Sequence, residues 1–104
     1  MVEYIENLSE YNSIISQNQL VVIEFTATWC GPCKQIAPVF ETLCQNNPHC
    51  IFRKVDVDEC DDICDKFNIS SMPTFQFFKN NKLLTQFSGA NIKQLQEDFK
   101  KYNG

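Results

Sequence analysis

Two spacings of hydrophobic residues recur along the chain, one typical of β-strands and one typical of α-helices. The segment from Leu20 to Ala27 is a continuous apolar run with a single charge, which predicts a strand buried on both faces. Strand-like patterns also cover residues 2–5, 51–57, 74–79 and 83–88. Helical spacing joins four further sets of residues: Leu8, Tyr11, Ile14 and Ile15; Ile36, Val39, Phe40, Leu43 and Cys44; Cys60, Ile63, Cys64 and Phe67; and Ile92, Leu95, Phe99 and Tyr102.

The predicted elements follow the order β-α-β-α-β-α-β-β-α. The alternation in the first part implies parallel strands joined by crossover helices. Asn80 and Asn81 separate the last two strands, and they predict a tight antiparallel hairpin because asparagine tolerates a positive φ. We therefore predict an α/β fold, in a single domain over residues 1–104, with a mixed sheet covered by helices on both faces.

Individual residues refine the predicted helices. Asn7 or Ser9 is the candidate N-cap of the first helix, and Asn91 is the candidate N-cap of the last. Pro38 lies inside the second helical pattern, where its missing N–H should kink the helix.

Composition and charge narrow the classes of partner. The 104 residues include 13 acidic and nine basic side chains, and the net charge of -4 argues against nucleic acid or an anionic membrane as the main partner. Six of the acids fall between Asp56 and Asp65, which we interpret as a solvated helix start. No apolar run approaches the roughly 18 residues of a membrane span. The first residues lack the basic start and apolar middle of a signal peptide, so we expect a cytoplasmic protein, and a monomer.

The sequence Cys30-Gly31-Pro32-Cys33 lies between the buried strand and the second helix. A thiol at the start of a helix faces free N–H groups and the positive end of the helix dipole, which both lower its pKa. The resulting thiolate is the form that attacks disulfides. We assign Cys30, which should be the more exposed, as the nucleophile, and Cys33 as the more buried resolving thiol. Gly31 and Pro32 tune the pair, Pro32 by stiffening the ring that the cysteines close.

Other uses of the six cysteines fit the pattern less well. A disulfide-stapled scaffold is disfavoured because there is no secretion signal and the apolar content is high enough for a core. A Cys-X-X-Cys pair is also half of a zinc site, but no second such pair follows. The residues that could complete a zinc site are Cys44, His49, Cys50, Cys60 and Cys64.

Glu24 is the only charge in the buried strand. Two interpretations stay open. The residue lies at a solvated edge position, or it is a buried carboxyl group whose pKa is raised because burial disfavours the charged form.

The sequence Trp29-Cys30-Gly31-Pro32-Cys33-Lys34 resembles the active site of the thioredoxin family. The resemblance covers nearly the whole chain and is carried further by Glu24-Phe25-Thr26-Ala27, Pro38, Val55-Asp56-Val57-Asp58, Met72-Pro73-Thr74-Phe75 and Phe87-Ser88-Gly89-Ala90. The chain is most similar to the eukaryotic cytosolic members. The resemblance implies a thioredoxin fold, in which a central five-stranded mixed sheet is flanked by four helices.

The resemblance also implies roles for single residues. Pro73 matches the family's cis-proline, which packs beside the active-site cysteines. Glu24 matches a position that is usually Asp and that relays a proton to or from the resolving cysteine, although the side chain here is one methylene longer. Lys54 matches a basic residue that pairs with this carboxylate in some members of the family.

An apolar patch around Cys30 is implied as the substrate-binding surface. It would consist of Trp29, Gly31, Pro32, Met72, Pro73, Gly89 and Ala90. Small residues and bare backbone let a partner chain approach closely. The backbone at Met72 is expected to pair with an extended substrate segment, much as an added strand would.

The activity that the resemblance implies is the reduction of protein disulfides by dithiol–disulfide exchange. The partners implied are thioredoxin reductase, which binds the NADPH, and substrates such as peroxiredoxins or ribonucleotide reductase. No cofactor or metal is expected on this chain itself. Two alternatives stay open: a disulfide isomerase or oxidase, and a non-enzymatic subunit of thioredoxin fold that binds or regulates a partner.

The remaining cysteines carry weaker signals. Cys44 is predicted to lie in a helix core and Cys50 at the start of a strand. Cys60 and Cys64 are four residues apart on a predicted helix and share a face, either as reduced small hydrophobic residues or as a regulatory bridge. Ser71 replaces a cysteine through which some animal members of the family form dimers, so that dimer is not expected.

Overall fold

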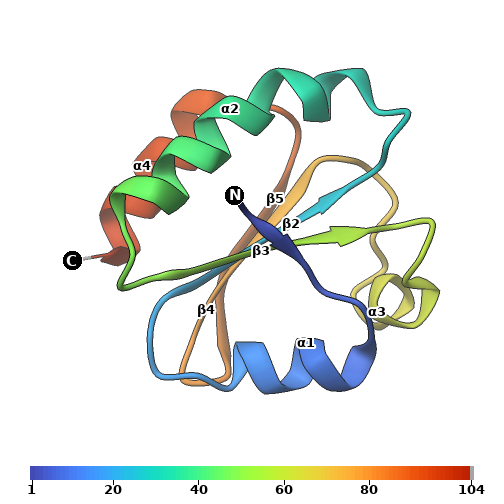
Figure 1. The fold of residues 1–104 in the computed structure, drawn as a ribbon, viewed down its shortest axis with the longest axis horizontal. Coiled ribbons are helices and arrows are strands. Elements are labelled where there is room, and N and C mark those ends of the chain that lie inside the picture. Colours follow the sequence, from blue (N-terminus) through green and yellow to red (C-terminus); the bar gives the residue numbers. More distant parts are fainter. Residues whose placement is uncertain (104) are drawn as a thin grey trace.

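Nine elements follow one another in the order that the hydrophobic pattern predicts (Figure 1). The structure is a computed structural model and describes residues 1–103. The elements are β1 (Glu3–Tyr4), α1 (Leu8–Ile15), β2 (Val21–Thr26), α2 (Gly31–Asn46), β3 (Ile51–Asp56), α3 (Asp61–Lys66), β4 (Thr74–Lys79), β5 (Lys82–Ser88) and α4 (Ile92–Asn103). Among these residues, no helix is long and apolar enough to cross a membrane.

The five strands form one mixed sheet in the order β1-β3-β2-β4-β5. Strands β1, β3 and β2 run parallel, whereas β4 is antiparallel to both β2 and β5. All six residues of β2 are buried, as its continuous apolar run predicts. This central strand, β2, ends at Thr26, only a few residues before the cysteine pair.

Helices cover both faces of the sheet (Figure 1). Helices α2 and α4 pack on one face, around a core that includes Phe40, Phe52 and Phe99. Helices α1 and α3 pack on the other face, where Tyr11 and Ile63 are completely buried. This arrangement confirms the predicted fold of five strands and four helices.

The local signals for turns and caps have clear counterparts in the structure. Asn80 and Asn81 have φ values of 53° and 64°, and they form the two-residue connection of the β4–β5 hairpin. Asn7, and not Ser9, caps α1 by accepting the Glu10 N–H at 2.8 Å. Asn91 accepts the Gln94 N–H at 3.0 Å at the start of α4.

Both ends of the third helix differ from the prediction, since Phe67 is the C-cap residue that follows α3. Cys60 stands at the N-cap position before α3 with a non-helical backbone (φ -135°, ψ 62°), so it lies outside the helix that holds Cys64. The hydrophobic spacing alone placed both residues on one helical face. Such spacing does not fix the first helical residue of so short a helix.

Candidate active site

The cysteine pair lies where the buried strand β2 gives way to helix α2. Cys30 is the N-cap residue of α2, with an extended backbone, and Pro32 falls in the first helical turn. Proline suits this place because its missing N–H would have no partner within the helix. The local sequence thus fixes the helix start, and it places the Cys30 sulfur at the end of the helix where N–H groups are free.

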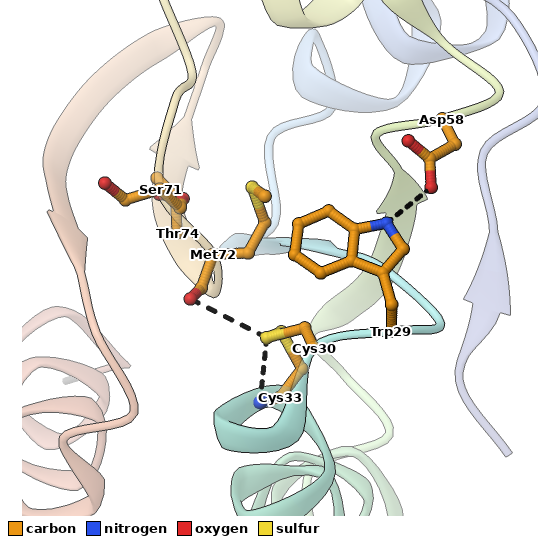
Figure 2. The surroundings of a disulfide bond; sticks show 7 residues. All are labelled: Trp29, Cys30, Cys33, Asp58, Ser71, Met72 and Thr74. Carbon is orange, nitrogen blue, oxygen red and sulfur yellow. Dashed lines mark hydrogen bonds between the residues drawn. A yellow bond between two sulfur atoms is a disulfide. The ribbon is translucent and has the colours of Figure 1, made fainter.

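Cys30 and Cys33 are joined by a disulfide bond, with their Cα atoms 5.3 Å apart. The Cys30 Sγ atom accepts the backbone N–H of Cys33 at 3.2 Å and lies 3.7 Å from the carbonyl oxygen of Met72 (Figure 2). An N–H group aimed at a sulfur atom stabilises negative charge on it. The geometry therefore favours a Cys30 thiolate once the disulfide is reduced.

Exposure does not distinguish the two cysteine residues, which corrects the expectation that Cys30 is the more exposed. The exposed fractions are 5% for Cys30 and 4% for Cys33. Ala27 packs with the two cysteines in one small apolar cluster, and Met72 and Val57 cover it from outside. The distinction between the two residues lies instead in the N-cap position of Cys30.

The segment before β4 closes the site from the opposite side. The Met72–Pro73 peptide bond is cis, the conformation that the family resemblance implies. Pro73 is buried, so it lies beneath the expected apolar patch and does not form part of the patch surface. Gly89, whose φ of 106° suits glycine, donates its N–H to the Pro73 carbonyl at 2.8 Å. This bond brings the loop with Gly89 and Ala90 to the cis-proline.

The remaining patch residues lie at the surface. Gly31 and Pro32 are exposed, while Met72, Gly89 and Ala90 are half-buried. Trp29 is 65% exposed, and its indole Nε1 donates a 2.8 Å hydrogen bond to the Asp58 carboxylate (Figure 2). The sequence alone marks Asp58 only as one of six solvated acids and gives no sign of this contact.

Glu24 is a buried carboxyl group, which excludes the solvated edge position. Only 1% of the residue is exposed, and its Oε1 atom has no hydrogen-bond partner among residues 1–103. Burial raises the pKa of Glu24 to about 7, the positive charge of Lys54 opposes this increase, and the negative charge of Glu41 adds to it. The carboxyl group can therefore both hold and release a proton near neutral pH.

A cavity of about 160 Å³ connects Glu24 with the redox pair. Its lining includes Glu24, Cys33 and Lys54. The structure thus brings the carboxyl group and the second cysteine to one small space, as a proton relay requires. Lys54 lies opposite Glu24 in the β2–β3 register, but its ammonium forms an ion pair with Glu41 at 3.9 Å. The implied pairing of Lys54 with Glu24 is not present.

The other cysteines are free thiols in this structure. Burial raises the pKa of Cys50, Cys60 and Cys64, and nearby acidic residues raise the last two further. The possible bridge between Cys60 and Cys64 is not formed. Among residues 1–103, no three His, Cys, Asp or Glu side chains are grouped so that they could hold a metal ion.

The family model described as thioredoxin matches residues 2–101. The chain belongs to the thioredoxin family. Curated thioredoxins resemble it over almost their full length. Thioredoxin from Ophiophagus hannah is 42% identical over 104 residues, which cover 98% of this chain and 99% of the relative. Thioredoxin 1 from Plasmodium falciparum is 45% identical over 102 residues and 98% of each chain.

Solved thioredoxin structures agree with this assignment. Plasmodium falciparum thioredoxin superposes with a TM-score of 0.91 at 44% identity, over 97% of this chain and 99% of that one. A similar chain is found in a structure that concerns the thiol resolving mechanism in yeast mitochondrial 1-Cys peroxiredoxin via glutathione/thioredoxin systems. It has a TM-score of 0.90 at 39% identity, over 96% of this chain and 94% of its own.

Family membership and the disulfide together define the chemistry of the site. The chain is a thiol–disulfide oxidoreductase of thioredoxin type, and Cys30 and Cys33 form its redox-active disulfide. In its reduced state such a dithiol reduces protein disulfides through a mixed disulfide.

Proposed function

We propose that this chain reduces protein disulfides with electrons that it receives from an NADPH-dependent thioredoxin reductase. The observation that carries the proposal is the Cys30 sulfur at the N-terminus of α2, 3.2 Å from the Cys33 N–H. This placement favours the thiolate form of Cys30 once the disulfide is reduced. A reducing cycle needs such a nucleophile ready before the substrate arrives.

In the first step, the Cys30 thiolate attacks one sulfur of a substrate disulfide. A bond forms between Cys30 and that sulfur, the substrate S–S bond breaks, and the other substrate sulfur leaves as a thiolate that takes up a proton. In the second step, Cys33 loses its proton and attacks the Cys30 sulfur. The second substrate sulfur leaves, and the substrate has gained the two electrons that the cysteine pair has lost.

Glu24 is the proposed acceptor of the Cys33 proton. A pKa of about 7 suits this task because a general base works best when its pKa lies near the operating pH. The cavity between the two residues is large enough for water, so the proton can travel through a water molecule. This route would accommodate the extra methylene of Glu24 relative to the usual aspartate.

The proposed substrate surface is the exposed ring of residues around the disulfide: Trp29, Gly31, Pro32, Met72, Gly89 and Ala90. An extended substrate segment would pair with the backbone at Met72, and Pro73 would support it from below. Peroxiredoxins and ribonucleotide reductase are the proposed substrates. Peroxiredoxins are supported by one similar solved structure, whose subject is a yeast mitochondrial 1-Cys peroxiredoxin.

The proposed partner for recharging carries the NADPH. The sequence contains no glycine-rich dinucleotide-binding motif, so the chain would work with its two thiols and no cofactor of its own. We place this cycle in the cytoplasm, where thiols are kept reduced.

The test is an insulin-disulfide reduction assay with two electron sources. Dithiothreitol as the reductant tests the exchange chemistry alone, and NADPH with thioredoxin reductase tests the recharging. Cys30→Ser should abolish both activities, whereas Cys33→Ser should accumulate a mixed disulfide visible by mass spectrometry. Full activity of Cys30→Ser would refute the assignment of the nucleophile. Turnover with dithiothreitol but not with the reductase would refute only the recharging partner.

The reduction potential separates reductase from isomerase or oxidase. A midpoint near the value of about -270 mV that is typical of thioredoxin supports a reductase. A midpoint of about -180 mV or above would contradict it. Cellular function retained by the double variant Cys30→Ser/Cys33→Ser would instead favour a non-enzymatic binding subunit.

A further inference from the structure

Glu41 shares one face of helix α2 with the redox pair. Cys33, Ala37 and Glu41 follow one another at intervals of four residues, the spacing at which helical side chains are neighbours. Cys33 and Ala37 line the small cavity that contains Glu24. Glu41 is the next residue along this face, one helical turn beyond the cavity.

The Glu41 carboxylate is fixed by backbone contacts as well as by charge. Its Oε1 and Oε2 atoms accept the Val2 N–H at 3.1 Å and 3.0 Å, and Oε2 lies 3.9 Å from the Met1 amino group. Oε1 lies 3.9 Å from the Lys54 Nζ atom. The segment that leads into β1 therefore holds this carboxylate in place, and the carboxylate in turn attracts the lysine.

Lys54 has two possible carboxylate partners and contacts only one. The β2–β3 register places it directly opposite Glu24. Its side chain is only 14% exposed, and its ammonium lies over the Tyr4 ring, 5.8 Å from the centroid, as well as beside Glu41. Meanwhile Glu24 Oε1 has no hydrogen-bond partner within the described chain.

We infer that Glu41 is a positioning residue that holds the Lys54 ammonium away from Glu24 and leaves that carboxyl group without an ion-pair partner beside Cys33. The inference rests on the proposed role of Glu24 as the proton acceptor. A lysine paired directly with Glu24 would stabilise the carboxylate and make it a weaker base for a thiol proton.

The charged and titratable groups around the cavity support this arrangement. Lys54 faces Glu24 from β3, and Tyr4 faces it from β1. Three further groups face it from α2: Cys33, Lys34 and Glu41. The negative charge of Glu41 raises the pKa of Glu24, and that of Lys54 lowers it. Removal of the Glu41 charge should therefore lower the pKa of Glu24 in two ways. It removes a nearby negative charge, and it frees the Lys54 ammonium to approach Glu24.

The first experiment measures the pKa of Glu24 by carboxyl ¹³C NMR in the oxidised protein, in which Cys33 does not titrate. Glu24→Gln identifies the resonance. In Glu41→Gln, which keeps an oxygen for the Val2 N–H, we expect the pKa of Glu24 to fall by about one unit or more. Glu97→Gln removes an exposed charge on α4 and should leave the pKa of Glu24 unchanged. An unchanged pKa in Glu41→Gln would overturn the inference.

A second variant isolates the part that Lys54 plays. In Lys54→Met, the pKa of Glu24 should rise, and adding Glu41→Gln to this background should lower it by much less than in the wild type. An equal decrease in both backgrounds would show that Glu41 acts through its own charge only. That result would overturn the positioning role.

The rate of the second step separates this inference from the proposed function. For the resolution of a mixed disulfide, the pH profile of Glu41→Gln should move to lower pH by the same amount as the pKa of Glu24. If the pKa moves and the profile does not, the proton role of Glu24 fails, while the positioning of Lys54 by Glu41 stands.

Discussion

The Trp29 indole donates its only N–H to the Asp58 carboxylate at 2.8 Å, although 65% of the tryptophan is exposed. The bond spans the gap between the active-site loop and the segment that follows β3 (Figure 2). It fixes the orientation of an aromatic ring that packing alone would leave free. If Trp29 belongs to the substrate surface as proposed, its ring is held before the partner binds, which reduces the entropy lost on association.

Removal of this acceptor should weaken substrate recognition without destabilising the fold. We expect Asp58→Ala to lower kcat/KM for a protein disulfide by about fivefold, because a net hydrogen bond contributes about 1 kcal/mol. Fluorescence anisotropy should show a more mobile Trp29. Asp58→Asn keeps an acceptor oxygen and should lie closer to the wild type. Asp61→Ala removes a neighbouring exposed acid and should have no effect. Unchanged kcat/KM in Asp58→Ala would contradict the role of the bond.

The buried carboxyl group of Glu24 should make stability depend on pH. Its pKa in the folded chain is about 7, compared with the ordinary 4.5. Between these values the unfolded chain has lost a proton that native Glu24 still holds, so rising pH favours unfolding. The free energy of unfolding should fall by about 3 kcal/mol from pH 4.5 to pH 7 and change little above that.

Urea unfolding at a series of pH values measures this decline. In Glu24→Gln, the decline should disappear, since the amide does not titrate. Glu97 lies on the surface of α4, so Glu97→Gln should retain the decline in stability with pH. A Glu24→Gln protein that lost stability over the same pH range would show that another group is responsible.

A buried hydrogen bond joins helix α1 to strand β4 of the sheet. The Tyr11 hydroxyl donates to Gln76 Oε1 at 2.6 Å, and Gln76 Nε2 donates to Gln86 Oε1 at 2.9 Å. Tyr11→Phe should lower the free energy of unfolding by about 1–3 kcal/mol, because it leaves the buried Oε1 atom unpaired. Tyr4→Phe removes a hydroxyl from a side chain that is 50% exposed and should change stability by less than about 0.5 kcal/mol. Equal effects of the two substitutions in urea unfolding would contradict this explanation.

The sequence predicts most of the fold because its signals are local. The apolar run of β2, the alternation of strands with helices, and the Asn80–Asn81 turn each depend on neighbouring residues. The same holds for the start of α2, where Cys30 and Pro32 are read directly from the motif. Short-range patterns of this kind survive in the folded chain because they are also the patterns that the sheet and helices require.

The contacts that surround the redox pair are less predictable because they join distant parts of the chain. Glu41 meets Val2 across 39 residues, and Trp29 meets Asp58 across 29. Nothing in the sequence separates these two carboxylates from the other surface acids. Likewise, the burial of Cys30 depends on Met72, which reaches the disulfide only through the packing of the segment before β4.

The burial of three further thiols has a consequence for repeated turnover. Cys50, Cys60 and Cys64 are shielded from solvent, and burial raises the pKa of each, so at neutral pH they stay protonated. Thiols in that state neither attack the Cys30–Cys33 disulfide nor compete for a mixed disulfide. The chain can therefore carry a reactive thiolate without exchanging its disulfide with these three buried sulfurs.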